Sequence, residues 1–125
     1  MFALTVRQPW AWGIAEGVKP IEFRSWKPGR SLLVGDSFAI HAGAYHFSED
    51  DLDEAAETFG RRPPDELDTS AIIAIVRLAA VDGDDGDYRW HVDQIRRLAK
   101  PVETKGKLGL WPVLPIIRAA VLKQI

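Results

Sequence analysis

The ten residues from Gly17 to Trp26 constrain the fold of this chain more than any other stretch. Gly17 tolerates the positive φ that ends a helix, and Pro20 fixes φ at the start of an extended segment. We therefore predict a strand over residues 19–26. Because side chains alternate across a strand, one face should pack in the core while the other face lines a site. The two faces are Ile21, Phe23 and Ser25, expected in the core, and Glu22, Arg24 and Trp26, expected at the site.

Three charged side chains give this predicted strand its chemical interest. Lys19, Glu22 and Arg24 place an ammonium, a carboxylate and a guanidinium within roughly 10–15 Å, at ~3.3 Å per residue. One interpretation is a solvated, salt-bridged face that adds about 0–1 kcal/mol to stability. The other is a binding site in which Lys19 and Arg24 contact a phosphate or a base edge, while Glu22 orients them or accepts a hydrogen bond from an exocyclic amine. The spacing alone leaves both interpretations open.

The order of these residues resembles the G-x-K-x-x-E-x-R signature of the ASCH domain family, a relative of the PUA fold. The preceding segment, residues 4–11, is similar to the opening of that family. Further matching positions follow in order and span nearly the whole chain: Arg30 and residues 40–42, 88–92, 101–102, 105–106 and 109–111. The resemblance implies an α+β fold, namely a small PUA-like mixed β-barrel flanked by short helices and formed as a single domain over residues 1–125. It also implies that the motif lines the cleft that receives the ligand.

Hydrophobic periodicity and turn residues predict six or so short strands with two or three helices. The first expected helix, residues 10–16, follows Pro9, and Gly13 leaves room on it for close packing. The second expected helix begins at the N-cap Ser48 and ends at Gly60. The expected strands are residues 2–6, 19–26, 38–42, 71–81, 88–92 and 98–102, with a strand or helix from residue 111 onward.

Tryptophan is abundant, with five in 125 residues, and supplies both core and stacking candidates. Because tryptophan is mostly buried in proteins, we expect Trp90 and Trp111 in the core or at its edge. Trp10 and Trp26 flank the motif, so they are the better candidates for stacking on an unpaired or modified base. Such a contact is worth ~1–3 kcal/mol.

A late loop and one histidine complete the predicted site. Lys105 and Lys107 lie on a glycine-jointed loop that could wrap a backbone phosphate, although an ordinary solvated hairpin would have the same sequence. His41 has apolar neighbours, and we expect a satisfied core or rim histidine there rather than a general base. The expected nucleic-acid-binding residues are Arg7, Trp10, Lys19, Glu22, Arg24, Trp26, His41, Lys105 and Lys107.

The distribution of charge is more informative than its total. A net charge of −2 and a pI near 5.9 argue against a histone-like binder that depends on many phosphate contacts. Residues 48–70 are strongly acidic, whereas residues 1–47 and 100–125 are basic. If the two ends meet, they form a local positive surface. We expect convergence of five cations on it, with the acidic helix at 49–57 lying away: Arg7, Lys19, Arg24, Lys105 and Lys107.

Several classes of site are absent from the sequence. The chain has no cysteine, which removes disulfides, cysteine metal sites and a thiol nucleophile. No histidine spacing suits a metal, and the acidic turn at 82–87 departs from the calcium-loop pattern, so we predict no metal and no cofactor. With no apolar run near 18 residues and no leader pattern, we expect a soluble cytoplasmic protein without membrane contact.

Three classes of function remain. The first is a nucleic-acid-binding module, which the PUA kinship and the basic ends support, with RNA, another single strand or a nucleoside as the ligand. The second is a small hydrolase acting on RNA or a modified nucleoside. The third is a domain that docks a protein partner, for which the sequence shows no exposed apolar patch.

The hydrolase alternative depends on Lys19 and Glu22. The resemblance implies that some family members hydrolyse an acylated cytidine and that others are linked to RNA cleavage. The first group has a lysine matching Lys19 but a threonine where this chain has Glu22, so that nucleophile is missing here. A carboxylate could instead act as general base toward a ribose 2′-hydroxyl, with Lys19 or Arg24 stabilising the transition state. Because a carboxylate beside two cations is a weak base, we favour binding over catalysis.

Overall fold

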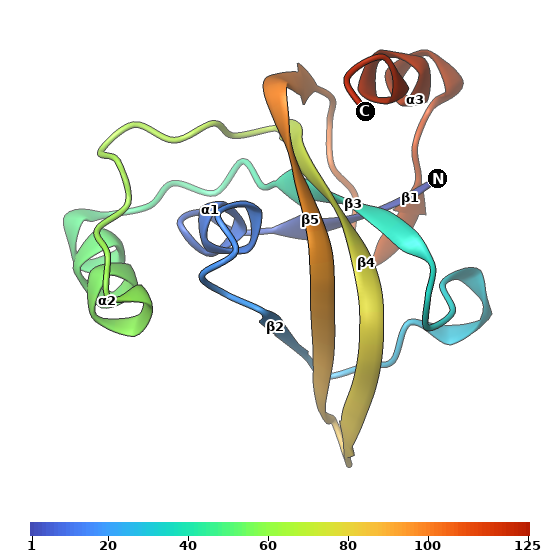
Figure 1. The fold of residues 1–125 in the computed structure, drawn as a ribbon. Helices are drawn as coiled ribbons and strands as arrows, with labels where there is room; N and C mark the ends of the chain where they lie inside the picture. Colours follow the sequence, from blue (N-terminus) through green and yellow to red (C-terminus); the bar gives the residue numbers. More distant parts are fainter.

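The computed structural model describes all residues from 1 to 125 as one six-stranded sheet with three α-helices around it (Figure 1). The strands are β1 (Phe2–Val6), β2 (Ile21–Arg24), β3 (Ser37–Ala42), β4 (Ala71–Asp84), β5 (Asp87–Glu103) and β6 (Leu110–Pro112). The helices are α1 (Trp10–Ala15), α2 (Glu49–Phe59) and α3 (Pro115–Leu122), with one 3₁₀ turn at Gly29–Ser31. This number of strands and helices agrees with the prediction.

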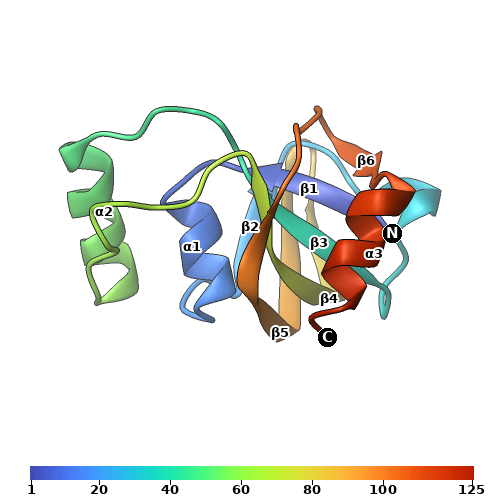
Figure 2. The same ribbon diagram turned by 90° about the horizontal axis from the view of Figure 1, so that it is seen from above.

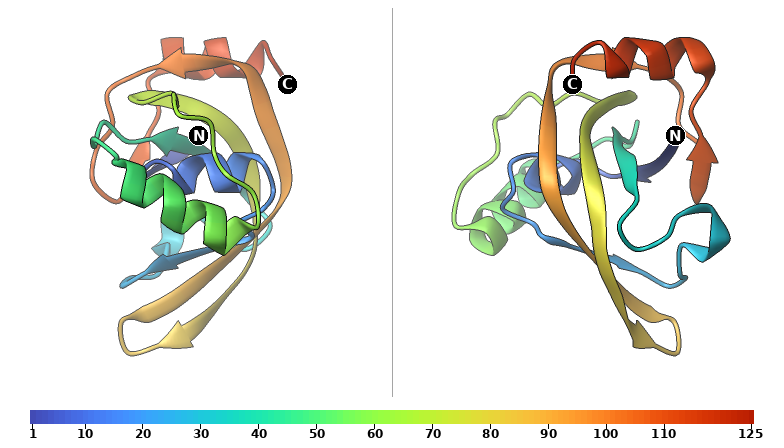
Figure 3. Two further views of the ribbon diagram at one scale, coloured as in Figure 1. Left: turned by 90° about the vertical axis from the view of Figure 1, so that its left-hand side faces the viewer. Right: turned by 45° about the vertical axis from the view of Figure 1, so that its right-hand side comes forward.

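The sheet is mixed and open. Its strand order is β2-β5-β4-β3-β1-β6, with β1 parallel to β3 and every other neighbouring pair antiparallel. The edge strands β2 and β6 do not pair with each other. Both edge strands are short, and β4 and β5 curve strongly around the interior (Figure 3). The predicted barrel is therefore present as a curved sheet that hydrogen bonds do not close.

Two strands are longer than predicted. Strand β4 has 14 residues and β5 has 17, and together they form the long hairpin that extends from the body of the molecule (Figure 1). The segments expected as separate strands at 88–92 and 98–102 are both parts of β5. Register shifts in the β4–β5 pairing, and a positive φ of 47° at Gln94, bend the ladder without ending it. A bend of this kind looks like a strand end in the sequence.

Helices α1 and α2 pack side by side at one end of the molecule (Figure 2). The Ser48 hydroxyl accepts the Asp51 N–H, and the Asp51 carboxylate accepts the Ser48 N–H, which forms the predicted cap of α2. Gly60 ends the helix with a φ of 71°. The Phe59 ring lies against Gly13 of α1, where any Cβ would collide with it. The close packing predicted at Gly13 is therefore confirmed.

Two hydrophobic clusters lie on the two faces of the sheet. The larger one packs α1 against β1, β3, β4 and β5 and contains Trp90, which is fully buried. The smaller one lies beneath α3 and contains Trp111, which is 4% exposed (Figure 2). Both tryptophans are in the core, as predicted. None of the helices is long and apolar enough to cross a membrane.

Candidate nucleic-acid interface

Lys19, Glu22 and Arg24 form a compact ion-paired cluster at β2. The Lys19 ammonium donates to Glu22 Oε1 at 2.6 Å, and Arg24 Nη2 and Nε donate to Oε2 at 2.8 and 3.2 Å. The same Nη2 donates to the carbonyl of Thr5 at 2.9 Å, and Lys19 donates to the carbonyl of Ile21 at 2.6 Å. Side-chain exposures are 15% for Lys19, 10% for Glu22 and 22% for Arg24. Both oxygens of Glu22 are therefore engaged, and the cluster ties β2 to β1.

The face of β2 that we predicted to pack in the core is largely exposed. Glu22 is buried and Arg24 and Trp26 are half-buried, whereas Phe23 is 66% exposed. As an edge strand, β2 has β5 as its one neighbour, and its outer face is left uncovered. The charged face can turn inward because two cations compensate the carboxylate there. The expectation that Phe23 and Ser25 face the core is wrong for this reason.

A hollow of about 490 Å³, which we call the first hollow, opens between β2 and the start of α1. Three cations line it, Arg7, Arg24 and Lys107, and neither Arg7 nor Lys107 forms an ion pair. The strand that carries the motif therefore does open onto a cleft beside the first helix. Aromatic side chains complete the wall: Trp10, Phe23, Trp26 and Tyr45.

Both tryptophans predicted to stack on a base reach the first hollow. The Trp10 ring packs edge-on against Phe59 at 5.6 Å, and the Trp26 ring packs edge-on against Trp90 at 5.0 Å. Each ring is half-buried, so the core fixes its orientation while part of it lines the hollow. A rigid, partly exposed ring can stack on a ligand with little loss of conformational entropy.

A second hollow of about 450 Å³ adjoins the first. Lys105 and His41 line only this one, whereas Thr5, Tyr45, Lys107 and Leu108 line both hollows. The two hollows are therefore continuous, and we call them together the basic groove. The glycine-jointed loop between β5 and β6 forms one wall of it.

His41 lies beneath the groove in a hydrogen-bonded network. Its Nε2 lies 2.6 Å from the Thr104 carbonyl, and its Nδ1 lies 3.1 Å from the Thr5 hydroxyl, which also accepts the Trp111 indole N–H at 3.1 Å. Because a carbonyl can only accept, Nε2 carries the proton and Nδ1 accepts from Thr5. Burial lowers the pKa of His41, although the bond to Thr104 acts in the opposite direction. His41 is therefore a neutral, satisfied core histidine, as predicted.

We expect the stability of the protein to fall as the pH decreases below about 6.5. The lowered pKa of His41 means that the unfolded chain binds this proton before the folded chain does, so stability is lost as the pH falls toward the folded pKa. The pKa values of Asp51 and Asp82 are also lowered, but these carboxylates lose their contribution only below about pH 4. Melting temperatures from pH 7.5 to 5, combined with an NMR titration of the His41 ring, measure the effect. His46→Gln, at an exposed position, is the control, and a wild-type stability that stays flat or rises over this window contradicts the assignment.

Gly106 fixes the loop against this network. A Cβ at this position would lie 2.6 Å from His41 Cε1 and 2.8 Å from Thr5 Oγ1. Gly106→Ala is therefore expected to destabilise the protein by about 1–3 kcal/mol, because a rigid buried ring must shift. Lys107→Ala, one residue along the same exposed loop, should leave the melting temperature nearly unchanged. Equal melting temperatures for the two variants would show that the loop does not pack as described.

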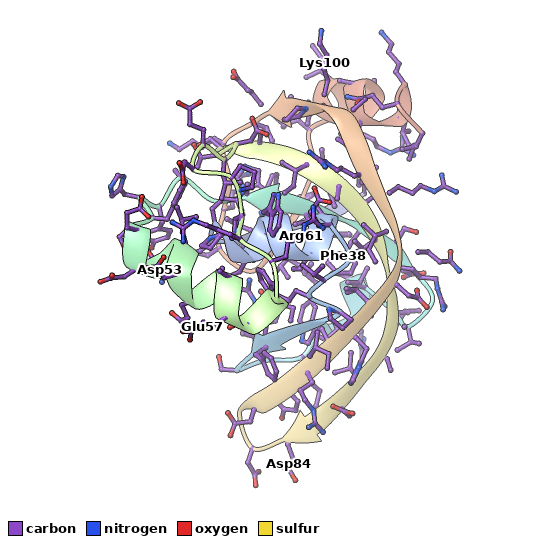
Figure 4. The ribbon with its side chains drawn as sticks, turned by 60° about the vertical axis from the view of Figure 1, so that its left-hand side comes forward. Phe38, Asp53, Glu57, Arg61, Asp84 and Lys100 are labelled. Atoms are coloured by element: carbon purple, nitrogen blue, oxygen red, sulfur yellow. The ribbon has the colours of Figure 1, made fainter.

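Four of the five cations expected to converge lie along the groove: Arg7, Arg24, Lys105 and Lys107. Lys19 lines neither hollow and holds Glu22 instead. The acidic helix α2 is not wholly remote, because Arg7 helps to lower the pKa of Asp51, after the larger effect of the Ser48 backbone N–H. The outer residues Asp53 and Glu57 point away from the body (Figure 4). The first turn of α2 is therefore near enough to interact with Arg7, although no residue of α2 lines either hollow.

Four residues are the most prominent among those that line the groove and that sequence patterns missed. Phe23, Tyr45 and Leu108 are 66%, 68% and 97% exposed, and Thr5 joins the His41 network to the Arg24 cluster. Arg7 stacks over the Tyr45 ring with its guanidinium carbon 5.4 Å from the centroid. The sequence signal for Tyr45 is only that it is an aromatic residue in the loop after β3. An isolated tyrosine is too common in loops to be identified as a site residue without the fold.

Comparison with known proteins relates this geometry to a family. The family model described as ASCH domain matches residues 4–105. Among solved structures, ASCH from Zymomonas mobilis is similar with a TM-score of 0.63 and 11% sequence identity, covering 98% of this chain and 93% of that chain. The S128A mutant of the Zymomonas mobilis protein gives a TM-score of 0.65 at 11% identity, covering 98% and 94% of the two chains. A search of curated proteins finds no match. At this identity the structural likeness shows a shared fold.

Proposed function

The chain belongs to the ASCH domain family, and on this premise we propose that it binds RNA or another single-stranded nucleic acid in the basic groove. The family is PUA-like, and in this proposal the open, curved sheet serves as its barrel framework. The turn after β1, the start of α1, the end of β2 and the loop between β5 and β6 then present the binding side chains.

The observation that carries this proposal is the pairing of free cations with fixed aromatic rings in one hollow. Arg7 and Lys107 form no ion pair within the chain, and Trp10 and Trp26 line the same space. Arg24 contributes a third cation, because its Nη1 makes no hydrogen bond within the protein. Cations that follow a phosphate backbone beside rings that stack on bases are typical of single-strand binding sites.

The hydrolase alternative is less well supported by the geometry. Glu22 would have to take a proton from a ribose hydroxyl, but both of its oxygens already accept hydrogen bonds from Lys19 and Arg24. His41 is the other candidate base, and its Nδ1 faces the Thr5 hydroxyl. A general base needs a free lone pair within reach of the proton that it removes. These contacts favour the binding role.

A binding screen tests the proposal. Short single-stranded RNA and DNA of equal length, a duplex and free nucleosides are titrated by fluorescence anisotropy at one salt concentration, and the RNA is then analysed for cleavage. We expect the single strands to bind and to remain intact. Failure of every nucleic acid to bind refutes the proposal. Cleavage that falls by about 10²–10⁴ in Glu22→Gln would establish the hydrolase instead.

A further inference from the structure

We propose that the basic groove holds two consecutive nucleotides of a single strand, one in each hollow, with the phosphate that joins them beside Lys107. This inference rests on the proposed function and adds the length and placement of the ligand. Three features of the groove carry it: the sizes of the two hollows, the positions of their cations and the charges at the two ends.

The two hollows are of nearly equal size. They measure about 490 and 450 Å³, and each is within the range of ~300–1,000 Å³ that holds one small ligand. Tyr45 and Lys107 line both, so they lie at the junction rather than at either end. The groove is therefore two connected compartments instead of one long trough, and each compartment suits one nucleotide.

The unpaired cations are distributed between the two hollows and their junction. Arg7 lines only the first hollow, Lys105 lines only the second, and Lys107 lines both. None of these three side chains forms an ion pair. A dinucleotide has a phosphate at its junction, and Lys107 is the cation at the junction of the hollows. Arg7 and Lys105 are then available to contact the phosphates at the two ends of the dinucleotide.

Acidic residues lie at the hairpin end of the groove, and at the other end an acidic segment precedes the lining residue Ser70 in the sequence. Next to the first hollow, a third hollow of about 510 Å³ lies at the β4–β5 hairpin and shares Phe23, Arg24 and Ser25 with it. Its charges differ from those of the groove, because Asp87 contributes a carboxylate and Arg89 is already paired with Asp82 at 2.7 Å. The hairpin tip adds Asp84, which projects into solvent (Figure 4). At the other end, the second hollow reaches Ser70, which follows the acidic segment at 65–68. A phosphate of a third nucleotide beyond the first hollow would meet the carboxylate of Asp87.

The test distinguishes the contribution of the second nucleoside to affinity from the contribution of the second phosphate charge. Calorimetry compares a nucleoside 5′-monophosphate, a nucleoside 3′,5′-bisphosphate and a 5′-phosphorylated dinucleotide of the same base, all as 2′-O-methyl compounds. We expect the dinucleotide to bind about tenfold tighter than the bisphosphate, because it has the same number of phosphates and one more base to stack. A trinucleotide should add less than about threefold beyond the dinucleotide.

Two variants test whether the higher affinity of the dinucleotide comes from the second hollow. Ala44→Glu and Lys105→Glu each place a carboxylate in that hollow on an exposed loop, so the ratio of dinucleotide to bisphosphate affinity should fall to about one. Ala119→Glu adds the same charge on the exposed side of α3 and should keep the wild-type ratio. A bisphosphate that binds as well as the dinucleotide overturns the two-nucleotide site but not the proposed function. Absence of binding by all of the compounds overturns both, and affinity that keeps rising tenfold with a third nucleotide overturns the two-nucleotide limit.

Discussion

Replacing Glu22 with alanine is expected to lower the free energy of unfolding by about 3 kcal/mol. The side chain is 10% exposed and bridges Lys19 and Arg24, so its removal leaves two largely buried cations without a counter-charge. For a domain of this length, the melting temperature should fall by about 10 °C. Thermal unfolding followed by circular dichroism measures the change.

Asp82→Ala is the matched control for this experiment. Asp82 also bridges two side chains, because it pairs with Arg89 and lies 3.1 Å from His91 Nε2, and it lies on β4 in the same sheet. Its side chain is 50% exposed, however, so water screens the pair and the variant should unfold close to the wild-type temperature. If Glu22→Ala is as mild as Asp82→Ala, the cluster does not stabilise the fold and Glu22 is free for another role.

The double variant Arg7→Ala with Lys107→Ala is expected to weaken binding of a short single strand by about 10- to 100-fold at low salt. Both cations line the first hollow and neither forms an ion pair. Their removal should therefore lower the affinity for the ligand, while the melting temperature stays nearly constant. Lys27→Ala with Lys123→Ala removes the same charge from exposed positions outside the groove and serves as the control. Equal losses in the two double variants would mean that net charge governs binding and that the groove does not.

Much of the fold could be predicted because its signals are local. The Ser48 cap and the stop at Gly60 each act within one turn of a helix, and the structure shows both. The joining of the basic ends could also be predicted, because Arg7 and Lys107 are conspicuous cations in segments that flank an acidic middle.

The orientation of β2 could not be predicted, because it depends on contacts distant in the sequence. The alternation of side chains along a strand places Phe23 and Glu22 on opposite faces, but it does not determine which face packs against the core. The Thr5 carbonyl, 19 residues before Arg24, accepts a hydrogen bond from the guanidinium and helps to make burial of the charged face favourable. From the sequence, Lys19 and Arg24 look like two equivalent ligands for a phosphate. In the fold Lys19 is structural, whereas Arg24 is both structural and exposed to the groove.

The continuity of β5 was hidden for a related reason. Residues 93–97 are mostly polar, so the sequence pattern shows a break there, and in the structure Gln94 adopts a positive φ inside the strand. Pairing with β4 on both sides of the bend holds the strand together. The same curvature brings the end of β5 and the following loop back to Thr5, so the second hollow could not be located without the bend.

The most direct test of the account is the salt dependence of single-strand binding. If Arg7 and Lys107 contact phosphates, each contact releases counterions, and the slope of log K against log salt concentration decreases by about 0.7 for each contact that is lost. The account predicts that the Arg7→Ala, Lys107→Ala protein has a slope about 1.4 smaller in magnitude than the wild type, whereas the Lys27→Ala, Lys123→Ala protein keeps the wild-type slope. An unchanged slope in the groove variant would contradict the claim that the basic groove binds a nucleic-acid backbone.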